Sequence, residues 1–224
     1  ILLHKAYGYR DVKAQDGLQV DDMFDLASLT KALVTAPAIL MLAQEGRIDL
    51  QAPISEYLKV DWATSPTVAQ LLTHHGGLPP VPDEMGFPET LLQTNLTLPP
   101  GEKFVYSDTG FLVLQKLVEK VSGEGLDEFY QHRIAAPLKV EQARFRPEAS
   151  RCVPTFGVPT GKVHDPRALK MGGVAGHAGL FGTALAVHRQ LSRLEKILSP
   201  ESRRLYFQEQ AGMIFFQDIE DMLH

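Results

Sequence analysis

The chain has 224 residues, of which 44% are hydrophobic and 22% are charged, and its formal net charge is -5. These values are typical of one globular domain or two small ones, with enough chain to bury a core. The acidic balance offers no basic surface for phosphate groups, which argues against nucleic acid as a partner. The single cysteine, Cys152, excludes an internal disulfide and carries no information about the cellular compartment.

The longest apolar run, residues 32–43, is too short to span a bilayer and contains Pro37, so we expect a buried helix there and no transmembrane segment. The sequence starts at Ile1 without an initiator methionine, a basic region or a signal-peptide core. We therefore expect that the natural start, with any export signal, lies upstream.

The first third of the chain predicts extended structure followed by one long helix. Residues 1–10 are rich in aliphatic and aromatic side chains and end before polar residues 11–17, a pattern typical of a strand and a turn. A second extended piece, residues 19–24, leads into a helix from about Ser28 to Gly46. Pro37 removes the hydrogen bond to the Leu33 carbonyl and should kink that helix, at a cost of about 3 kcal/mol in an unsupported helix.

The remainder predicts mainly helices and loops. Helical patterns cover residues 48–58, 67–72, 111–121, 126–134 and 184–198, and Asp108 or Thr109 is expected to cap the third of these. Loops rich in glycine and proline cover residues 73–80, 153–166 and 171–183. After residue 200 the one strand-like piece is Met213-Ile214-Phe215-Phe216.

Ser28 and Lys31 form an S-x-x-K pattern at the start of the long helix. Residues three apart are neighbours on a helix surface, so the amine is expected beside the hydroxyl, which is a poor nucleophile until its proton is removed. The Ser28 amide would also be one of the unpaired N–H groups at the helix start, where negative charge is stabilised. The structural alternative for an isolated match is a capping serine with a solvated lysine.

Tyr106 lies at the end of a turn, just before the expected helix at 111–121. Such a tyrosine is usually half-buried packing. The functional alternative is a phenol that takes the proton of the serine and returns it to the leaving group.

Three histidines invite a metal interpretation, which the sequence does not support. His74 and His75 are adjacent, and neighbours in sequence rarely point at one metal; no HExxH or second cysteine accompanies them, so a structural loop is expected. His177 lies in a glycine-rich segment that lacks the Lys-Ser/Thr of a phosphate loop. It is a candidate acid–base group, with a buried histidine satisfied by backbone as the alternative.

Taken in order, these motifs resemble the serine β-lactamase and penicillin-binding-protein superfamily, class C-like branch. The resemblance covers residues 2–190 and rests on a chain of motifs: Ala27–Lys31, Leu71–Leu78, Pro100-Gly101 with Tyr106-Ser107-Asp108, Pro137-Leu138, and Lys162–Pro166 before Gly176–Phe181. The branch includes D-alanyl-D-alanine carboxypeptidases and family VIII esterases. It implies an α+β, β-lactamase/transpeptidase-like fold with a helical region and, in this chain, an incomplete antiparallel sheet.

The resemblance implies roles for four residues. Ser28 would be the acyl-forming nucleophile, Lys31 its proton partner and Tyr106 the base of the second motif, while Asp108 takes a substrate-contacting position that usually holds asparagine. A carboxylate there would hold the Lys31 amine charged as an ion pair, which favours Tyr106 as the group that takes the Ser28 proton. A small acyl substrate is expected, with no cofactor and no metal, and the resemblance implies a periplasmic location.

The third motif of the family, Lys-Thr-Gly or a variant on a late strand, is missing from this sequence. We therefore expect either a truncated chain or a second chain that completes the sheet, and a self-contained sheet of about five strands would refute this. By the same resemblance, residues 1–50 would form the N-terminal strands and nucleophile helix, 51–170 a mainly helical region, and 171–224 the return to the α/β part.

Three functions compete on this evidence. The first is a serine hydrolase that acts through an acyl-enzyme on an ester, a β-lactam or a D-Ala-D-Ala-like peptide. The second is a catalytically impaired relative that binds a peptidoglycan-like ligand or a partner. The third is a metal hydrolase that uses His74, His75 and His177.

Overall fold

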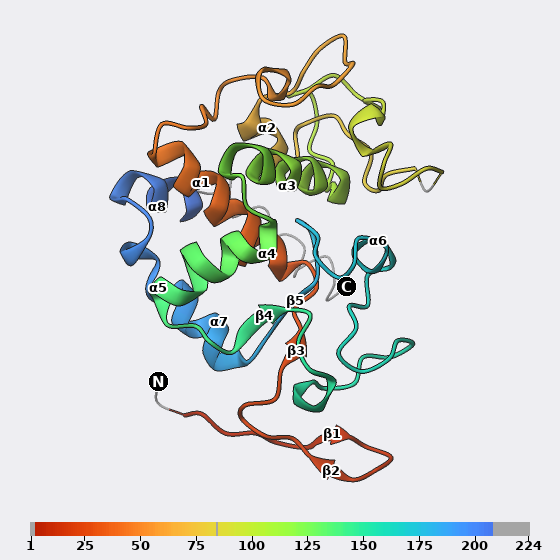
Figure 1. Cartoon of the computed structure of the whole chain (residues 1–224), viewed down its shortest axis with the longest axis vertical. Helices are drawn as coiled ribbons and strands as arrows, with labels where there is room; N and C mark the ends of the chain where they lie inside the picture. The colour runs from red at the N-terminus through yellow and green to blue at the C-terminus, as the bar shows by residue number, and fades with distance from the viewer. Residues whose placement is uncertain (1–2, 84, 208–224) are drawn as a thin grey trace.

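The computed structural model describes residues 3–83 and 85–207 (Figure 1). Helices α2 and α3 lie at one end of the molecule and the β1–β2 hairpin at the other, with α1 passing between them. The α-helices are α1 (Ala36–Gln44), α2 (Val68–Leu72), α3 (Asp108–Ser122), α4 (Leu126–Phe129), α5 (Ala136–Leu138), α6 (Pro166–Lys170), α7 (Ala184–Leu191) and α8 (Pro200–Phe207). The π-helical segments are η1 (Lys31–Thr35) and η4 (Tyr130–Ala135), and 3-10 turns are η2 (Ile54–Glu56), η3 (Leu91–Gln93), η5 (Ala149–Arg151) and η6 (Leu194–Lys196).

Two small antiparallel sheets complete the described part of the chain. Strands β1 (Tyr9–Asp11) and β2 (Asp16–Gly17) form a hairpin, and the second sheet has the order β3 (Phe24–Asp25), β5 (Leu180–Gly182), β4 (Ala143–Phe145). In that sheet Asp25 pairs with Phe181, and Arg144 pairs with the same residue from the other side. Strand β5 follows the glycine-rich segment that contains His177, and β3 leads into Ser28. Their pairing therefore places these two segments side by side.

The long helix expected after Ser28 forms, but its first part is π-helical. Segment η1 continues directly into α1, and Pro37 lies in the first turn of α1, so its missing N–H falls inside a continuous helix. Single π-helical turns inside helices are rare and often lie at functional sites. The segment carrying Lys31 is therefore wider than an ordinary α-helix.

Because Pro37 has no N–H, it bonds neither to the Leu33 carbonyl, four residues earlier as in an α-helix, nor to the Ala32 carbonyl, five residues earlier as in a π-helix. The buried side-chain amide of Gln190 donates to the Leu33 carbonyl. The Tyr206 hydroxyl donates to the Ala32 carbonyl at 3.1 Å. Side chains from the C-terminal helices thus replace the bonds that proline cannot make, as buried backbone groups require.

Helix α3 is the centre of the core. Its residues from Phe111 to Leu114, together with Leu117 and Val118, are fully buried. The Ser107 hydroxyl accepts from the Gly110 N–H at 3.0 Å, and Gly123 ends the helix with φ +80°. Ser107, and not Asp108 or Thr109, is therefore the cap, which leaves the Asp108 side chain available for the site.

Several expected elements differ in extent from the observed ones. The strand expected over residues 1–10 is reduced to β1, because residues 3–8 form no ladder. Residues 48–58 contain only the turn η2, and the helical structure expected over 126–134 continues through η4 into α5, with Pro137 in its first turn. The strand-like piece Met213–Phe216 lies outside the described residues.

The described part of the chain has helices and small antiparallel sheets, so the α+β prediction is confirmed. Its larger sheet has three strands, short of the five that would have refuted an incomplete sheet. None of the helices in residues 3–83 and 85–207 combines the length and the apolarity needed to cross a bilayer. The division at residues 50 and 170 stays a prediction.

Candidate active site

Ser28 lies on an exposed turn immediately before the helix. The preceding residue, Ala27, has φ +44°, a left-handed conformation that costs an L-residue about 1–3 kcal/mol and is most often retained at functional sites. The Asp25 carboxylate stabilises this turn because it accepts the Ala27 N–H at 2.9 Å and the His164 N–H at 2.8 Å. The serine hydroxyl is therefore presented to solvent on a fixed turn.

Lys31 is fully buried one turn further on, and its ammonium is surrounded by acceptors. Its Nζ lies 2.9 Å from Ser28 Oγ, 2.8 Å from Asp108 Oδ1 and 3.4 Å from the His177 carbonyl. An ammonium has three N–H donors and no acceptor. Two hydrogen bonds, to Ser28 and to the His177 carbonyl, and an ion pair with Asp108 therefore surround the Lys31 ammonium.

Tyr106 lies against the same ammonium. The Lys31 Nζ is 4.6 Å from the centroid of the half-buried Tyr106 ring. The other side of the tyrosine packs on His74, with ring centroids 4.4 Å apart and an interplanar angle of 33°. The structure thus brings all four sequence-predicted residues together, since Ser28, Lys31, Tyr106 and Asp108 meet around one nitrogen atom.

His74 packs against the Tyr106 ring and bonds to the backbone of Ser107, so its role here is structural. Its Nδ1 accepts the Ser107 N–H at 2.9 Å, which leaves the ring neutral with its proton on Nε2. Burial, with smaller contributions from the charges of Lys31 and His75, lowers the pKa of His74 to about 3. The backbone of His74 has φ +58°, so a second strained residue lies beside the site.

His177 is 1% exposed, and its Nε2 lies 2.9 Å from Asp165 Oδ1. The same carboxylate oxygen caps α6, because it accepts the N–H groups of Arg167 and Ala168. Burial tends to raise the pKa of Asp165, but the hydrogen bond and charge of His177 and the two backbone donors lower it to about 2. Of the two interpretations of His177, the buried histidine is correct in its burial, but its ring partner is a carboxylate and not the backbone.

The three histidines do not assemble into a metal site in the described residues. The group with metal-ligand geometry there is Asp108, Asp165 and His177, whose ligand atoms lie within 4.8 Å of one another. Lys31 already pairs with Asp108, and the other two bond to each other. A hydrogen-bonded cluster around an ammonium describes this group better than an ion site, since a divalent cation would be repelled by Lys31.

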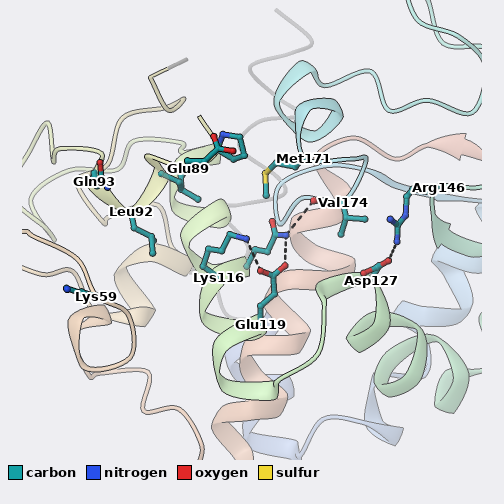
Figure 2. Close-up of a pocket in the computed structure, with 13 residues that line it drawn as sticks. Lys59, Glu89, Leu92, Gln93, Lys116, Glu119, Asp127, Arg146, Met171 and Val174 are labelled. Atoms are coloured by element: carbon teal, nitrogen blue, oxygen red, sulfur yellow. Dashed lines mark hydrogen bonds and ion pairs between the residues drawn. The ribbon is translucent and has the colours of Figure 1, made fainter. Parts of the chain in front are cut away.

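A cavity of about 680 Å³ lies elsewhere, between α3, α4 and the segment 171–174 (Figure 2). Its wall carries Glu119 between Lys116 and Gln115, and an ion pair between Asp127 and Arg146. Its described lining includes none of the four residues around Lys31. Cavity size therefore does not locate the candidate chemistry in this chain.

The sequence matches the β-lactamase family over residues 1–218, so the chain belongs to that family. A relative from Salmonella typhimurium, provisionally named D-alanyl-D-alanine carboxypeptidase, is 28% identical over 239 residues, which cover 81% of this chain and 54% of the relative. The chain thus spans about half the length of the curated relatives it matches.

Solved structures share the fold at lower identity. The octameric penicillin-binding protein homologue from Pyrococcus abyssi superimposes with a TM-score of 0.73 at 24% identity, over 93% of this chain and 54% of that one. The D-amino acid amidase from Ochrobactrum anthropi gives a TM-score of 0.74 at 21% identity, over 88% and 64%. The predicted β-lactamase/transpeptidase-like fold is confirmed.

Sequence reasoning missed the residues that hold the cluster from outside. Neither Asp25 nor Asp165 was predicted as a site residue, although Asp165 lies in the motif Lys162–Pro166. The one available signal was the pattern Asp-Pro at 165–166, typical of a helix start with a capping carboxylate. Nothing in the sequence pairs that cap with His177.

Proposed function

We propose that this chain is a serine hydrolase that forms an acyl-enzyme on Ser28. Its substrate would be a carboxylic ester, a β-lactam or a D-Ala-D-Ala-type peptide. The observation that carries the proposal is the exposed Ser28 hydroxyl 2.9 Å from a fully buried Lys31 ammonium, with Asp108 and Tyr106 beside it. Membership of the β-lactamase family supports the same reaction class.

In this proposal Lys31 acts as a charged donor. An ammonium has no lone pair with which to take a proton, so its role is to orient the Ser28 hydroxyl and to stabilise negative charge that develops on Oγ. Asp108 balances the ammonium. The base is then Tyr106, whose phenolate would be stabilised by the ammonium next to its ring.

The proposed reaction has two steps. Ser28 Oγ attacks the carbonyl carbon and forms the new carbon–oxygen bond while its proton passes to the Tyr106 oxygen. The carbon–oxygen or carbon–nitrogen bond to the leaving group then breaks as the departing alcohol or amine takes that proton, which leaves the acyl group on Ser28. Water later attacks the acyl group, with Tyr106 again taking and returning a proton. The Ser28 N–H, at the start of the helix, would be one donor to the oxyanion.

The alternative is a relative that binds an acyl ligand without efficient turnover. The observation that favours it is the missing Lys-Thr-Gly motif, which in the resembled family supplies the second oxyanion donor. Loss of one such donor lowers kcat by about 10² to 10³. Slow acylation with little turnover would therefore fit this chain better than complete inactivity.

We also propose that a second chain completes the three-stranded sheet. Strand β3 lies at an edge of that sheet, and its Phe24 is 40% exposed. An exposed edge is a template for pairing with another strand. Native mass spectrometry at micromolar concentration should then show a dimer, and a monomer at all concentrations would contradict this part of the proposal.

The test of the reaction is intact mass after incubation with a fluorophosphonate, and separately with a penicillin. We expect one adduct per chain, located on Ser28 by peptide mapping and absent in Ser28→Ala. Ser192→Ala, which changes an exposed serine outside the cluster, is the matched control and should label like the wild type. Unlabelled wild-type protein, or label that survives Ser28→Ala, would refute the proposal. Ester hydrolysis that a chelator abolishes and that Ser28→Ala leaves unchanged would instead support the metal hydrolase.

A further inference from the structure

Three segments form a chain of contacts that ends at Lys31. The nucleophile helix contributes the ammonium, the glycine-rich segment contributes the His177 carbonyl at 3.4 Å, and the loop before α6 contributes Asp165, bonded to the His177 ring at 2.9 Å. Main chain and side chain of His177 therefore point to different partners. The carbonyl contacts the reacting group, and the imidazole contacts a carboxylate.

We propose that Asp165 and His177 are positioning residues for Lys31. In this inference, which rests on the proposed function, the Asp165–His177 bond fixes the peptide at residue 177, and its carbonyl is the third acceptor that holds the ammonium against Ser28 and Asp108. Neither side chain needs to contact substrate.

The peptides on both sides of His177 are already anchored. Thr35 Oγ1 donates to the Gly176 carbonyl at 2.6 Å, and Gln115 accepts the Gly176 N–H at 2.9 Å. On the other side, the Leu180 N–H donates to Thr30 Oγ1 at 3.1 Å. Between these anchors at residues 176 and 180, the His177 carbonyl contacts Lys31 and the His177 ring contacts Asp165, so the ring is a further anchor of this peptide.

The loop that carries Asp165 is tied to the nucleophile turn as well. Its neighbour His164 donates its N–H to Asp25, whose other carboxylate oxygen holds the Ala27 N–H next to Ser28. The contacts thus form a closed ring from Ser28 through Asp25, His164–Asp165 and His177 back to Lys31. A movement of the loop would alter both the nucleophile and its lysine.

Charge supports the same role. An Asp165 oxygen, an Asp108 oxygen and a ring nitrogen of His177 lie within 4.8 Å of one another, next to the ammonium. The hydrogen bonds that lower the pKa of Asp165 to about 2, against the opposing effect of burial, keep it ionised at neutral pH. Asp165 thus adds a second negative charge to the cluster that surrounds the Lys31 ammonium.

The experiment separates this role from helix capping. Asp165→Ser keeps a good N-cap for α6 but is too short to hold the His177 ring. Asp165→Asn keeps the cap and an acceptor but loses the charge. We expect Asp165→Ser to lower kcat for a p-nitrophenyl ester between about 10-fold and 100-fold, because small misplacements of catalytic groups have effects of this size. KM should be unchanged, and Asp165→Asn should retain more activity than Asp165→Ser.

A second readout does not depend on turnover. In protein labelled with ¹⁵N at the lysine side chains, the Lys31 signal is assigned by its loss in Lys31→Arg. We expect that signal to shift in both Asp165 variants and to stay unchanged in Asp127→Asn, a matched removal of a carboxylate that pairs with Arg146 outside the cluster (Figure 2).

The outcomes distinguish the two proposals. If Ser28 takes no label in the wild type but the Lys31 signal moves in the Asp165 variants, the proposed function fails and the positioning role stands. If Ser28 is labelled and Asp165→Ser keeps the wild-type kcat and Lys31 signal, the positioning role is overturned. If Asp165→Ser does not fold, the Lys31 signal of Asp165→Asn decides in the same way.

Discussion

The Asp108 carboxylate lies 2.8 Å from the ammonium of Lys31, which is itself fully buried. A buried charge that loses its partner costs far more than the pair contributes, because the remaining charge is left without compensation. Much of the stability around the site therefore depends on a residue that the related motif usually fills with asparagine.

This pairing predicts a graded loss of stability. Asp108→Ala should lower the free energy of unfolding by about 3–5 kcal/mol, the range found when one partner of a buried pair is removed. Asp108→Asn should cost less because its amide oxygen still accepts from Lys31. Urea denaturation followed by circular dichroism measures both.

The double variant completes this cycle. Lys31→Met with Asp108→Asn removes both charges, so it should be more stable than the sum of the single effects predicts. Additive effects of the two substitutions would show that the two groups do not interact in solution.

A second prediction concerns the carbonyls left free by Pro37. Gln190, 1% exposed, donates to the Leu33 carbonyl and accepts from the Tyr130 hydroxyl at 2.9 Å. Gln190→Leu would leave two buried polar groups unpaired, each at a cost of about 1–3 kcal/mol. Thermal unfolding should show the loss directly.

Gln44→Leu is the matched control for this substitution. Gln44 also bonds backbone groups, at Ile197 and Ser199, but it is exposed, so water can replace its bonds. We expect Gln44→Leu to change the free energy of unfolding by less than half of the Gln190→Leu effect. Equal effects would mean that the carbonyl at the π-turn does not need its side-chain donor.

His74 makes stability depend on pH. Its pKa is about 3 in the folded chain, chiefly because of burial, and returns to its ordinary value of 6.5 on unfolding. Between these values the unfolded chain binds more protons, so stability falls as the pH falls from 6.5 towards 3, by up to about 1.4 kcal/mol per pH unit. The contribution is complete above pH 6.5.

His74→Asn tests this linkage. Asparagine tolerates a positive φ and offers an oxygen to the Ser107 N–H, but it does not titrate. Urea unfolding at pH 7, 6 and 5 should give a flatter dependence for the variant, in a range where Asp165, with its pKa of about 2, does not contribute. Parallel curves for variant and wild type would contradict the assignment.

The sequence predicted the residues of the site but not the contacts that hold them in place. Ser28 and Lys31 are three residues apart on one helix, and Tyr106 and Asp108 flank a helix start, so local geometry predicts their placement. Their meeting depends on α3 packing against the nucleophile helix, which the family resemblance supplied and periodicity did not. The Asp165–His177 bond joins two loops, and no local pattern predicts such a pair.

The fold shows the same division. Amphipathic spacing predicted α3, since burial of one face imposes a helical period, and a continuous apolar run predicted the long helix. It did not predict η1, because the π-turn depends on donors from Gln190 and Tyr206, far away in the chain. The strands were overestimated for the same reason: two- and three-residue ladders exist only through their partners.

The last prediction uses two glycines of the segment that carries His177. A Cβ at Gly176 would lie 2.2 Å from the Phe111 carbonyl oxygen, so Gly176→Ala must displace the segment from α3. A Cβ at Gly172 would meet nothing within 4 Å, and Gly172→Ala should cost only the strain of its φ of +75°, about 1–2 kcal/mol. Both variants lose a glycine, but only the first moves the 177 carbonyl.

Labelling of Ser28 therefore separates the two variants better than their stabilities do, since overpacking at Gly176 also costs about 1–3 kcal/mol. The rate of fluorophosphonate labelling, measured well below the melting temperature of each variant, should fall at least 10-fold for Gly176→Ala, because displacement of a catalytic group by about 1 Å has effects of this order. For Gly172→Ala it should stay within twofold of the wild type. Equal labelling rates in the two variants would show that the segment does not hold Lys31 in place, whatever happens to stability.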